Sequence, residues 1–341
     1  MSYYGFRSTY PYLFRTTKNA SRNRKDSARF GAGICDATTG NFFIKTVTGY
    51  SAGRARQLKS ILGELRLTSK QAKTLRVKSH TRLSPYLENC CVRSSANVSY
   101  EDAARDVLEY TGIKVSAKTQ QRLVHRQEFQ LPQVKAEVEE LSVDGGKIRL
   151  RTEVGYACVW RDYKAVSLHG HATGAWFYDN QGLIDWVKSQ QLSPVITCIG
   201  DGHDGIWNIM AALAPLHQRR EVLDWYHLKQ NLYKVSAAYK RLRLAEVFLW
   251  RGNVDAAKQL FTLSNRQHAQ NFCAYLEKHR HRIVNYHDFH TAGICVASGS
   301  VESAVKQLDR RIQISGAQWL EQNVPQVLAQ RSAYLNGMLS F

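Results

Sequence analysis

The sequence lacks several features that would place a chain in a familiar class. None of its apolar runs approaches the roughly 18 residues needed to cross a bilayer, and its N-terminal residues lack the apolar stretch of a secretory signal. None of the seven cysteines belongs to a Cys-x-x-Cys pair, and an odd count in 341 residues disfavours a disulfide framework. These absences favour a protein of the reducing cytoplasm. An apolar content of 44% excludes a fully disordered chain.

Acidic residues are few compared with basic ones. The chain has 28 Asp and Glu against 47 Lys and Arg, which gives a formal net charge of +19. Nine Lys or Arg and one acid, Glu64, lie between Arg54 and Arg82, and residues 1–30 are also basic. Because Lys and Arg neutralise phosphates in nucleic-acid binding, this distribution predicts a polyanionic partner. We expect residues 1–30 to be loosely ordered without DNA, and an ordinary solvated surface is the alternative for each cluster.

Residues 85–135 are expected to form a helix-turn-helix-like segment that binds DNA. Ser99 to Asp102 resembles a capping box before a helical apolar face, and Gly112 ends that helix. Ser116 begins a second helix with a polar and basic face suited to a groove. The residues of that face predicted to bind DNA are Lys118, Arg122 and Arg126. The alternative is a helical hairpin that only packs beside the next domain.

From Leu141 onward, short apolar runs alternate with helical patterns. Their order, β-β-β-α-β-α-β, predicts an α/β fold in which a mixed sheet has helices on both faces. Residues 229–289 then lose strand character and predict consecutive helices. We therefore expect a core formed by 136–228 and 290–341, interrupted by an all-helical insertion over 229–289. A helical, basic and partly disordered N-terminal region, 1–84, would precede it.

Two aspartates each follow an apolar run predicted to be a strand, and each is followed at once by glycine. They are Asp144 in VDGG and Asp201 in GDG. A carboxylate at the end of a strand can project into a crevice, and the glycine lets a backbone or a phosphate come close. Asp-Gly is also a common turn, so each motif alone is compatible with a plain turn. Glu302, in the first turn of a predicted helix, would complete an oxygen cage for Mg²⁺, although an acid there also stabilises the helix dipole.

Together these motifs resemble the catalytic region of DDE transposases from bacterial insertion sequences. The closest lineage is the Kra type (ISKra-like), which is related to the Mutator-like elements. The motifs are Asp144 in VDGG, Asp201 in GDGHDGIWN, Asp224 and His227 in LDWYHLKQNL, and Glu302 in SGSVES with Lys306 and Arg310 after it. Asp201 follows Asp144 by 57 residues, and Glu302 follows Asp201 by 101. The resemblance runs from about residue 85 to the C-terminus.

The resemblance implies an RNase H-like fold in which the long second interval is the helical insertion. It also implies DNA cleavage and strand transfer with two Mg²⁺ ions, or Mn²⁺ as a substitute, held by Asp144, Asp201 and Glu302 as the catalytic residues. In the accessory motif His227 would hold the scissile phosphate or a flanking base, and Asp224 would orient it. A helix-capping aspartate with a hydrogen-bonded histidine is the alternative interpretation of that motif.

The partners that the resemblance implies are double-stranded DNA, as terminal inverted repeats and target, and further copies of the chain in a homodimer or larger assembly. The protein would act in the bacterial cytoplasm, associated with the nucleoid. Two alternative functions stay open: an RNase H-like nuclease that cuts branched DNA without strand transfer, and a catalytically idle, transposase-derived DNA-binding regulator.

Further DNA contacts are predicted in and after the helical insertion. They are Trp250, which would stack on an extruded base, and the cations Arg280, Arg282, Lys306 and Arg310. Six Cys and His residues also lie between Cys273 and Cys295. They lack the paired cysteines of a zinc finger, so the sequence does not predict zinc.

Overall fold

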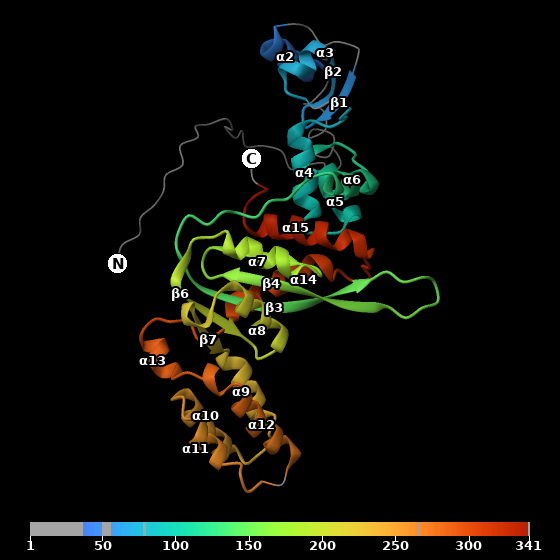
Figure 1. Cartoon of the computed structure of the whole chain (residues 1–341). Helices are drawn as coiled ribbons and strands as arrows, with labels where there is room; N and C mark the ends of the chain where they lie inside the picture. The colour runs from blue at the N-terminus through green and yellow to red at the C-terminus, as the bar shows by residue number, and fades with distance from the viewer. Residues whose placement is uncertain (1–36, 50–55, 78–79, 265, 340–341) are drawn as a thin grey trace, which may run out of the picture. The chain divides into compact units, whose positions relative to one another are not determined.

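The computed structural model describes residues 37–49, 56–77, 80–264 and 266–339 (Figure 1). The chain divides into two compact units, Met1–Arg82 and Leu83–Phe341. Each unit is described by itself below. The segment 1–30, predicted to be loosely ordered, lies outside the described residues.

The described part of the first unit is a small α/β structure with a core of its own. Its elements are α2 (Ala37–Thr48), the antiparallel hairpin of β1 (Arg56–Ser60) and β2 (Gly63–Leu67), and α3 (Ser69–Thr74). Leu58, Leu65 and Leu67 are buried with Ile44 and Ala72. The prediction of a helical region is therefore wrong for 56–67. Apolar residues alternate there with the period of two that is typical of strands, a pattern that the run of charges obscured.

The second unit is built on a five-stranded mixed sheet. Its strands are β3 (Val138–Leu150), β4 (Val159–Leu168), β5 (Ala172–Trp176), β6 (Leu192–Gly200) and β7 (Arg219–Leu223). They lie in the order β5-β4-β3-β6-β7. The central strand β3 pairs antiparallel with β4 and parallel with β6, and β6 pairs parallel with β7. The predicted mixed α/β fold is thus confirmed.

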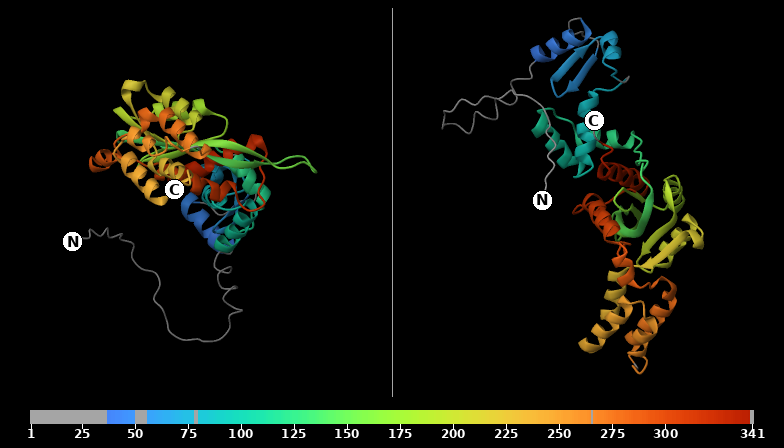
Figure 2. Two further views of the ribbon diagram at one scale, coloured as in Figure 1. Left: turned by 90° about the horizontal axis from the view of Figure 1, so that it is seen from below. Right: turned by 90° about the vertical axis from the view of Figure 1, so that its left-hand side faces the viewer.

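Helices cover both faces of this sheet, as predicted (Figure 1, Figure 2). The helices are α7 (Asn180–Lys188), α8 (Asp204–Leu213), α14 (Gly299–Ile312) and α15 (Val324–Leu335). Leu141 and Val143 of β3 join the core of α7 and α8, whereas Ile148 and Leu150 join the core of α14 and α15. Successive side chains of a strand point to opposite faces, so β3 contributes to two separate cores.

Between β7 and α14 the chain is helical. Its elements are α9 (Trp225–Tyr233), α10 (Tyr239–Trp250), α11 (Val254–Gln259), α12 (Gln267–Lys278), the 3₁₀ turn η2 (Arg280–Arg282) and α13 (Tyr286–Thr291). Further 3₁₀ turns are η1 (Leu216–Gln218) and η3 (Glu321–Asn323). The apolar side chains of α9 to α13 continue the core of α7 and α8. Among the described residues, no helix is long and apolar enough to span a membrane.

In the second unit three helices precede the sheet, one more than the predicted pair. They are α4 (Pro85–Ser95), α5 (Tyr100–Thr111) and α6 (Ala117–His125), and each packs against the other two. Ser99 and Ser116 cap α5 and α6 by accepting hydrogen bonds from backbone N–H groups three residues on. Gly112 ends α5 with a φ of 70°. The predicted starts of α5 and α6 and the end of α5 are therefore correct.

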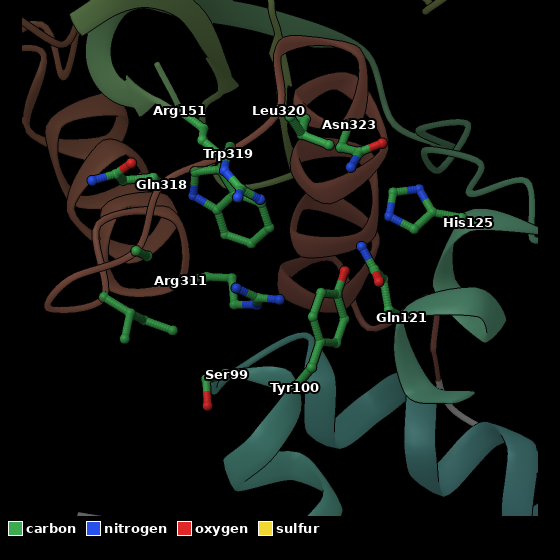
Figure 3. A pocket seen from close by; sticks show the side chains of 12 residues that line it. Ser99, Tyr100, Gln121, His125, Arg151, Arg311, Gln318, Trp319, Leu320 and Asn323 are labelled. Atoms are coloured by element: carbon green, nitrogen blue, oxygen red, sulfur yellow. The ribbon is translucent and has the colours of Figure 1, made fainter. Parts of the chain in front are cut away.

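Two buried arginines join the end of α4 to α14 and α15, and Figure 3 shows the first of them, Arg311. Arg311 of α14 donates from Nε to the Ser95 carbonyl at 2.7 Å, and Arg331 of α15 donates to the next carbonyl at 3.1 Å. These carbonyls lie at the C-terminus of α4, where a cation is favourable. The Arg311 guanidinium also lies against the rings of Trp319 and Tyr100, at 4.9 and 5.2 Å. We therefore assign the cavity of about 260 Å³ beside Arg311 to the packing of α14 against α4 and α5, and not to a ligand site.

Candidate active site

The sheet brings three aspartates to one edge. The parallel ladder between β3 and β6 ends two residues before Asp144 and Asp201. The ladder between β6 and β7 ends one residue before Asp201 and Asp224. Because the carboxyl ends of parallel strands meet at the same edge of a sheet, these residues start from neighbouring positions. Residues far apart in sequence are thus adjacent in the fold.

The strand that carries Asp144 does not end there, although the two glycines after it predicted an end. β3 continues through both glycines to Leu150, paired with β4. A Cβ at Gly146 would lie 2.3 Å from the ring of the buried Tyr163. The Tyr163 hydroxyl donates to Asp309 Oδ1 at 2.9 Å. Gly146 therefore makes room for the Tyr163 ring. At Gly145, the glycine directly after Asp144, a Cβ would lie 3.0 Å from the backbone carbonyl oxygen of Tyr163, so the predicted close approach of a backbone is found there.

Replacing Gly146 with alanine is expected to lower the free energy of unfolding by about 1–3 kcal/mol, the usual cost of adding a methyl group to a packed site. Gly299→Ala is the matched control, because nothing lies within 4 Å of a Cβ at that position. Urea denaturation of the two variants measures the difference. Equal stabilities would show that the Tyr163 ring can move aside at no cost.

The turn after Asp201 fixes its carboxylate. β6 ends at Gly200, so the predicted position at a strand end is correct here. Gly202 has a φ of +95°, and a Cβ at Gly202 would lie 3.0 Å from the Tyr275 hydroxyl. The backbone N–H of His203 donates to Asp201 Oδ1 at 2.8 Å. The glycine therefore serves the turn that orients the acid.

Asp224 connects the accessory motif to the helix that carries Glu302. Its side chain is fully buried, and Oδ1 accepts hydrogen bonds from the backbone N–H of His227 at 2.7 Å and from His227 Nδ1 at 3.1 Å. Oδ2 accepts from the backbone N–H of Ser298, immediately before α14. Glu302 Oε1 lies 4.0 Å from His227 Nδ1 and accepts from the Ser298 hydroxyl at 3.4 Å. Asp224 is the cap of α9, as the alternative interpretation predicted, and also the bridge to α14.

The charged groups at this edge affect each other's ionisation. Burial raises the pKa of the Asp144 carboxyl, and the negative charges of Asp201 and Glu302 raise it further. The hydrogen bond with Asp224 raises the pKa of His227, although burial opposes it. Burial alone would raise the pKa of Asp224, but its hydrogen bonds outweigh burial and lower it. The acids therefore share one environment with an excess of negative charge.

This environment fits a divalent cation. Asp144, Asp201 and Glu302 are partly exposed, so their carboxylates can reach a hydrated ion. One ligand atom each from Asp224, His227 and Glu302 lies within 4.8 Å of the others, whereas Asp144, Asp201 and Glu302 do not form such a group among the described residues. Asp224, however, is buried and already accepts three hydrogen bonds. The carboxylates that can still bind an ion are therefore those of the three predicted catalytic acids. Asp224 and His227 instead fit the role of positioning residues.

Two serines that the sequence analysis did not identify also support the site. Ser142 lies two residues before Asp144 on β3, so both side chains point to the same face. The Ser142 hydroxyl lies 3.3 Å from that of Ser300 in the first turn of α14. This contact ties the helix of Glu302 to the strand of Asp144. The period of two along the strand is the signal that could have identified Ser142.

The predicted DNA-binding cations of α6 and α14 are on the surface. The exposed residues are Lys118, Arg122, Arg126, Lys306 and Arg310. Lys306 and Arg310 follow Glu302 by one and two turns and share its helix face. Lys306 Nζ lies 3.9 Å from Glu302 Oε2, and Arg126 pairs with Glu88 at 2.5 Å. A row of positive charge thus leads away from the acids along α14.

Trp250 lies in an aromatic cluster. Its ring centroid is 4.8 Å from that of Trp225 and 6.0 Å from that of Tyr286. These neighbours belong to the core beneath the helices between β7 and α14. Packing accounts for this tryptophan, so we do not carry the predicted stacking on an extruded base into the functional proposal.

Arg282 and Arg280 both form ion pairs with acids of this chain. Arg282 donates from Nε to Glu221 Oε2 at 2.6 Å, and its guanidinium lies 4.1 Å from the centre of the Trp207 ring. Arg280 binds one carboxylate on α11 and another on α12. The sequence could not distinguish cations that pair with acids of the same chain from cations that bind DNA. We therefore leave both arginines out of the proposed DNA contacts.

Neither a scan against models of known protein families nor a search of curated proteins finds a match to this chain. The fold and the geometry of the acidic site therefore carry the functional argument.

Proposed function

We propose that this protein is a DNA transposase of the DDE type, which cleaves DNA at the ends of a mobile element and joins those ends to target DNA. The observation that carries the proposal is the convergence of Asp144, Asp201 and Glu302 at one edge of a mixed sheet. They are separated by 57 and 101 residues, and the negative charges of Asp201 and Glu302 raise the pKa of Asp144. The helical segment between β7 and α14 is compatible with an insertion into an RNase H-like core.

The proposed chemistry is metal-dependent phosphoryl transfer. Two divalent ions, Mg²⁺ or Mn²⁺, would when bound activate the attacking oxygen and stabilise the departing one. Asp144 and Asp201, from adjacent strands, and Glu302, from α14, would hold these ions. Asp224 orients His227 and raises the pKa of its imidazole. That ring is therefore more protonated near neutral pH and can donate its other N–H to the scissile phosphate.

The proposed substrate is double-stranded DNA, both as element ends and as target. Lys306 and Arg310 would neutralise phosphates next to the acids, and Lys118 and Arg122 of α6 would contact DNA further along. Each of these side chains is exposed. Because transposition pairs two ends, we propose that the active form on DNA is a dimer or a larger assembly.

A DNA-joining assay tests this proposal. The protein is incubated with Mg²⁺ and two duplexes. One is labelled and contains the DNA that flanks the coding region of this protein, and the second is unlabelled. We expect metal-dependent cleavage that leaves a 3′-hydroxyl and then a labelled product joined to the second duplex. A plain duplex of equal length is the control. Cleavage without joining would favour the branched-DNA nuclease, and binding without cleavage would favour the idle regulator. Either result would overturn the proposal.

A further inference from the structure

A second group of potential metal ligands lies beside the acidic site. Glu140 of β3, His169 directly after β4 and Cys295 in the segment before α14 each place one ligand atom within 4.8 Å of the other two. Glu140 Oε2 lies 3.4 Å from His169 Nδ1. The three residues come from distant parts of the sequence, and none belongs to a recognisable metal motif. Only the fold brings them together.

Hydrogen bonds orient two of these ligands, Glu140 and His169. Glu140 Oε1 accepts from the backbone N–H of Cys295 at 2.7 Å, which directs Oε2 toward His169. His169 Nε2 lies 2.9 Å from the Ser142 hydroxyl, so Nδ1 faces the other ligands. Metal-binding histidines commonly use their second nitrogen in this way, and metal-binding carboxylates are oriented by similar contacts. The group therefore has the supporting contacts of a metal site as well as its ligand atoms.

The ionisation of the group is compatible with metal binding. Burial lowers the pKa of His169, which keeps the ring in the neutral form that a ligand requires. Burial raises the pKa of the Cys295 thiol, which donates to the Ala297 carbonyl at 3.2 Å. A divalent transition metal displaces the proton of a thiol that it binds, so binding here would release this proton to solvent.

We propose that Glu140, His169 and Cys295 bind a zinc ion, with water as the fourth ligand. A set of one sulfur, one nitrogen and one oxygen favours zinc over Mg²⁺. Tetrahedral zinc holds its ligand atoms about 3.5 Å apart. These three lie within 4.8 Å of one another, so they need to close by at most about 1.3 Å. The side chains of Glu140 and His169 are 22% and 13% exposed, so an ion can reach them from solvent.

The bound ion would fasten the start of α14 to the sheet. Cys295 lies in the segment that leads into this helix, and Glu302 is in its first turn. Ser142 contacts both His169 and Ser300, so it joins the zinc ligands to that same turn. Zinc would therefore position Glu302 without taking part in the reaction. The inference does not depend on the DNA chemistry proposed above.

Titration of the chelator-treated full-length protein with Co²⁺ tests this site. Excess Mg²⁺ is present, because it occupies the carboxylate site in preference to a sulfur-containing one. We expect one tightly bound Co²⁺ with a thiolate-to-cobalt charge-transfer band, which added Zn²⁺ removes. Cys295→Ser should lose this band. Cys273→Ser, at a partly buried cysteine outside the group, should keep it. Glu140→Gln and His169→Gln should each weaken Co²⁺ binding at least about tenfold.

Two results would overturn the inference. One is a charge-transfer band that persists in Cys295→Ser, and the other is a folded wild-type protein that binds neither Co²⁺ nor Zn²⁺. Circular dichroism of each variant checks that it is folded. Asp144→Asn should bind Co²⁺ with an unchanged spectrum, because Asp144 is not a ligand of this site. Failure of the zinc site is therefore distinguishable from failure of the proposed transposase activity.

Discussion

Asp144→Asn is expected to lower metal-dependent DNA cleavage by at least about 10³-fold, on the scale of removing one preorganised group that stabilises a transition state. Asparagine keeps the size of the side chain but cannot supply the negative charge that holds the ions. DNA binding without metal should change by less than about twofold, because exposed cations provide most of that affinity. Single-turnover cleavage of end-bearing DNA and a mobility-shift assay measure the two quantities.

Asp201→Asn and Glu302→Gln are expected to behave in the same way. Asp162→Asn is the matched control, because Asp162 is an exposed carboxylate on β4 outside the acidic group. It should cleave DNA at the wild-type rate. If any one of the three active-site variants keeps its activity, that residue does not hold a metal ion.

Glu221→Gln is expected to lower the free energy of unfolding by about 3 kcal/mol. Glu221 is buried and binds Arg219 and Arg282 at 2.6 Å each. Removal of its charge leaves two largely buried cations without an acid, which is the costly way to break a buried ion pair. Asp255→Asn is the control, because Asp255 forms a solvent-exposed pair with Arg280, and exposed ion pairs contribute little to stability. Urea denaturation at pH 7 should separate the two variants, and similar losses in both would contradict a special role for the buried pair.

The stability lost in Glu221→Gln is expected to depend on pH. Burial alone would raise the pKa of Glu221, but hydrogen bonds from Arg219 and Arg282 outweigh it and lower the pKa. An acid whose pKa is lower in the folded state stabilises the fold above its unfolded pKa, about 4.3, and this stabilisation is lost as the pH falls through the folded value. The difference in free energy of unfolding between the wild type and Glu221→Gln should therefore have its full value at pH 7 and become smaller below about pH 4.

Local sequence signals predicted much of the second unit. Ser99, Gly112 and Ser116 marked helix ends correctly, because a cap depends on residues within one turn. Apolar runs likewise gave the mixed sheet and its flanking helices. Where two signals competed, the prediction failed. The charges of 54–82 obscured the hairpin of 56–67, and the glycines after Asp144 suggested an end to a strand that continues to Leu150.

The sequence by itself determined the excess of basic residues, the order of the elements, and the resemblance that selected Asp144, Asp201 and Glu302. Only the tertiary structure decided which side chains have partners. It pairs Arg282 with the buried Glu221 and packs Trp250 against other aromatic rings. It also places Glu140, His169 and Cys295 in one group. The physical reason is that a propensity or a cap depends on neighbours along the chain. Burial, charge pairing and metal ligation depend instead on residues that folding brings together from distant segments.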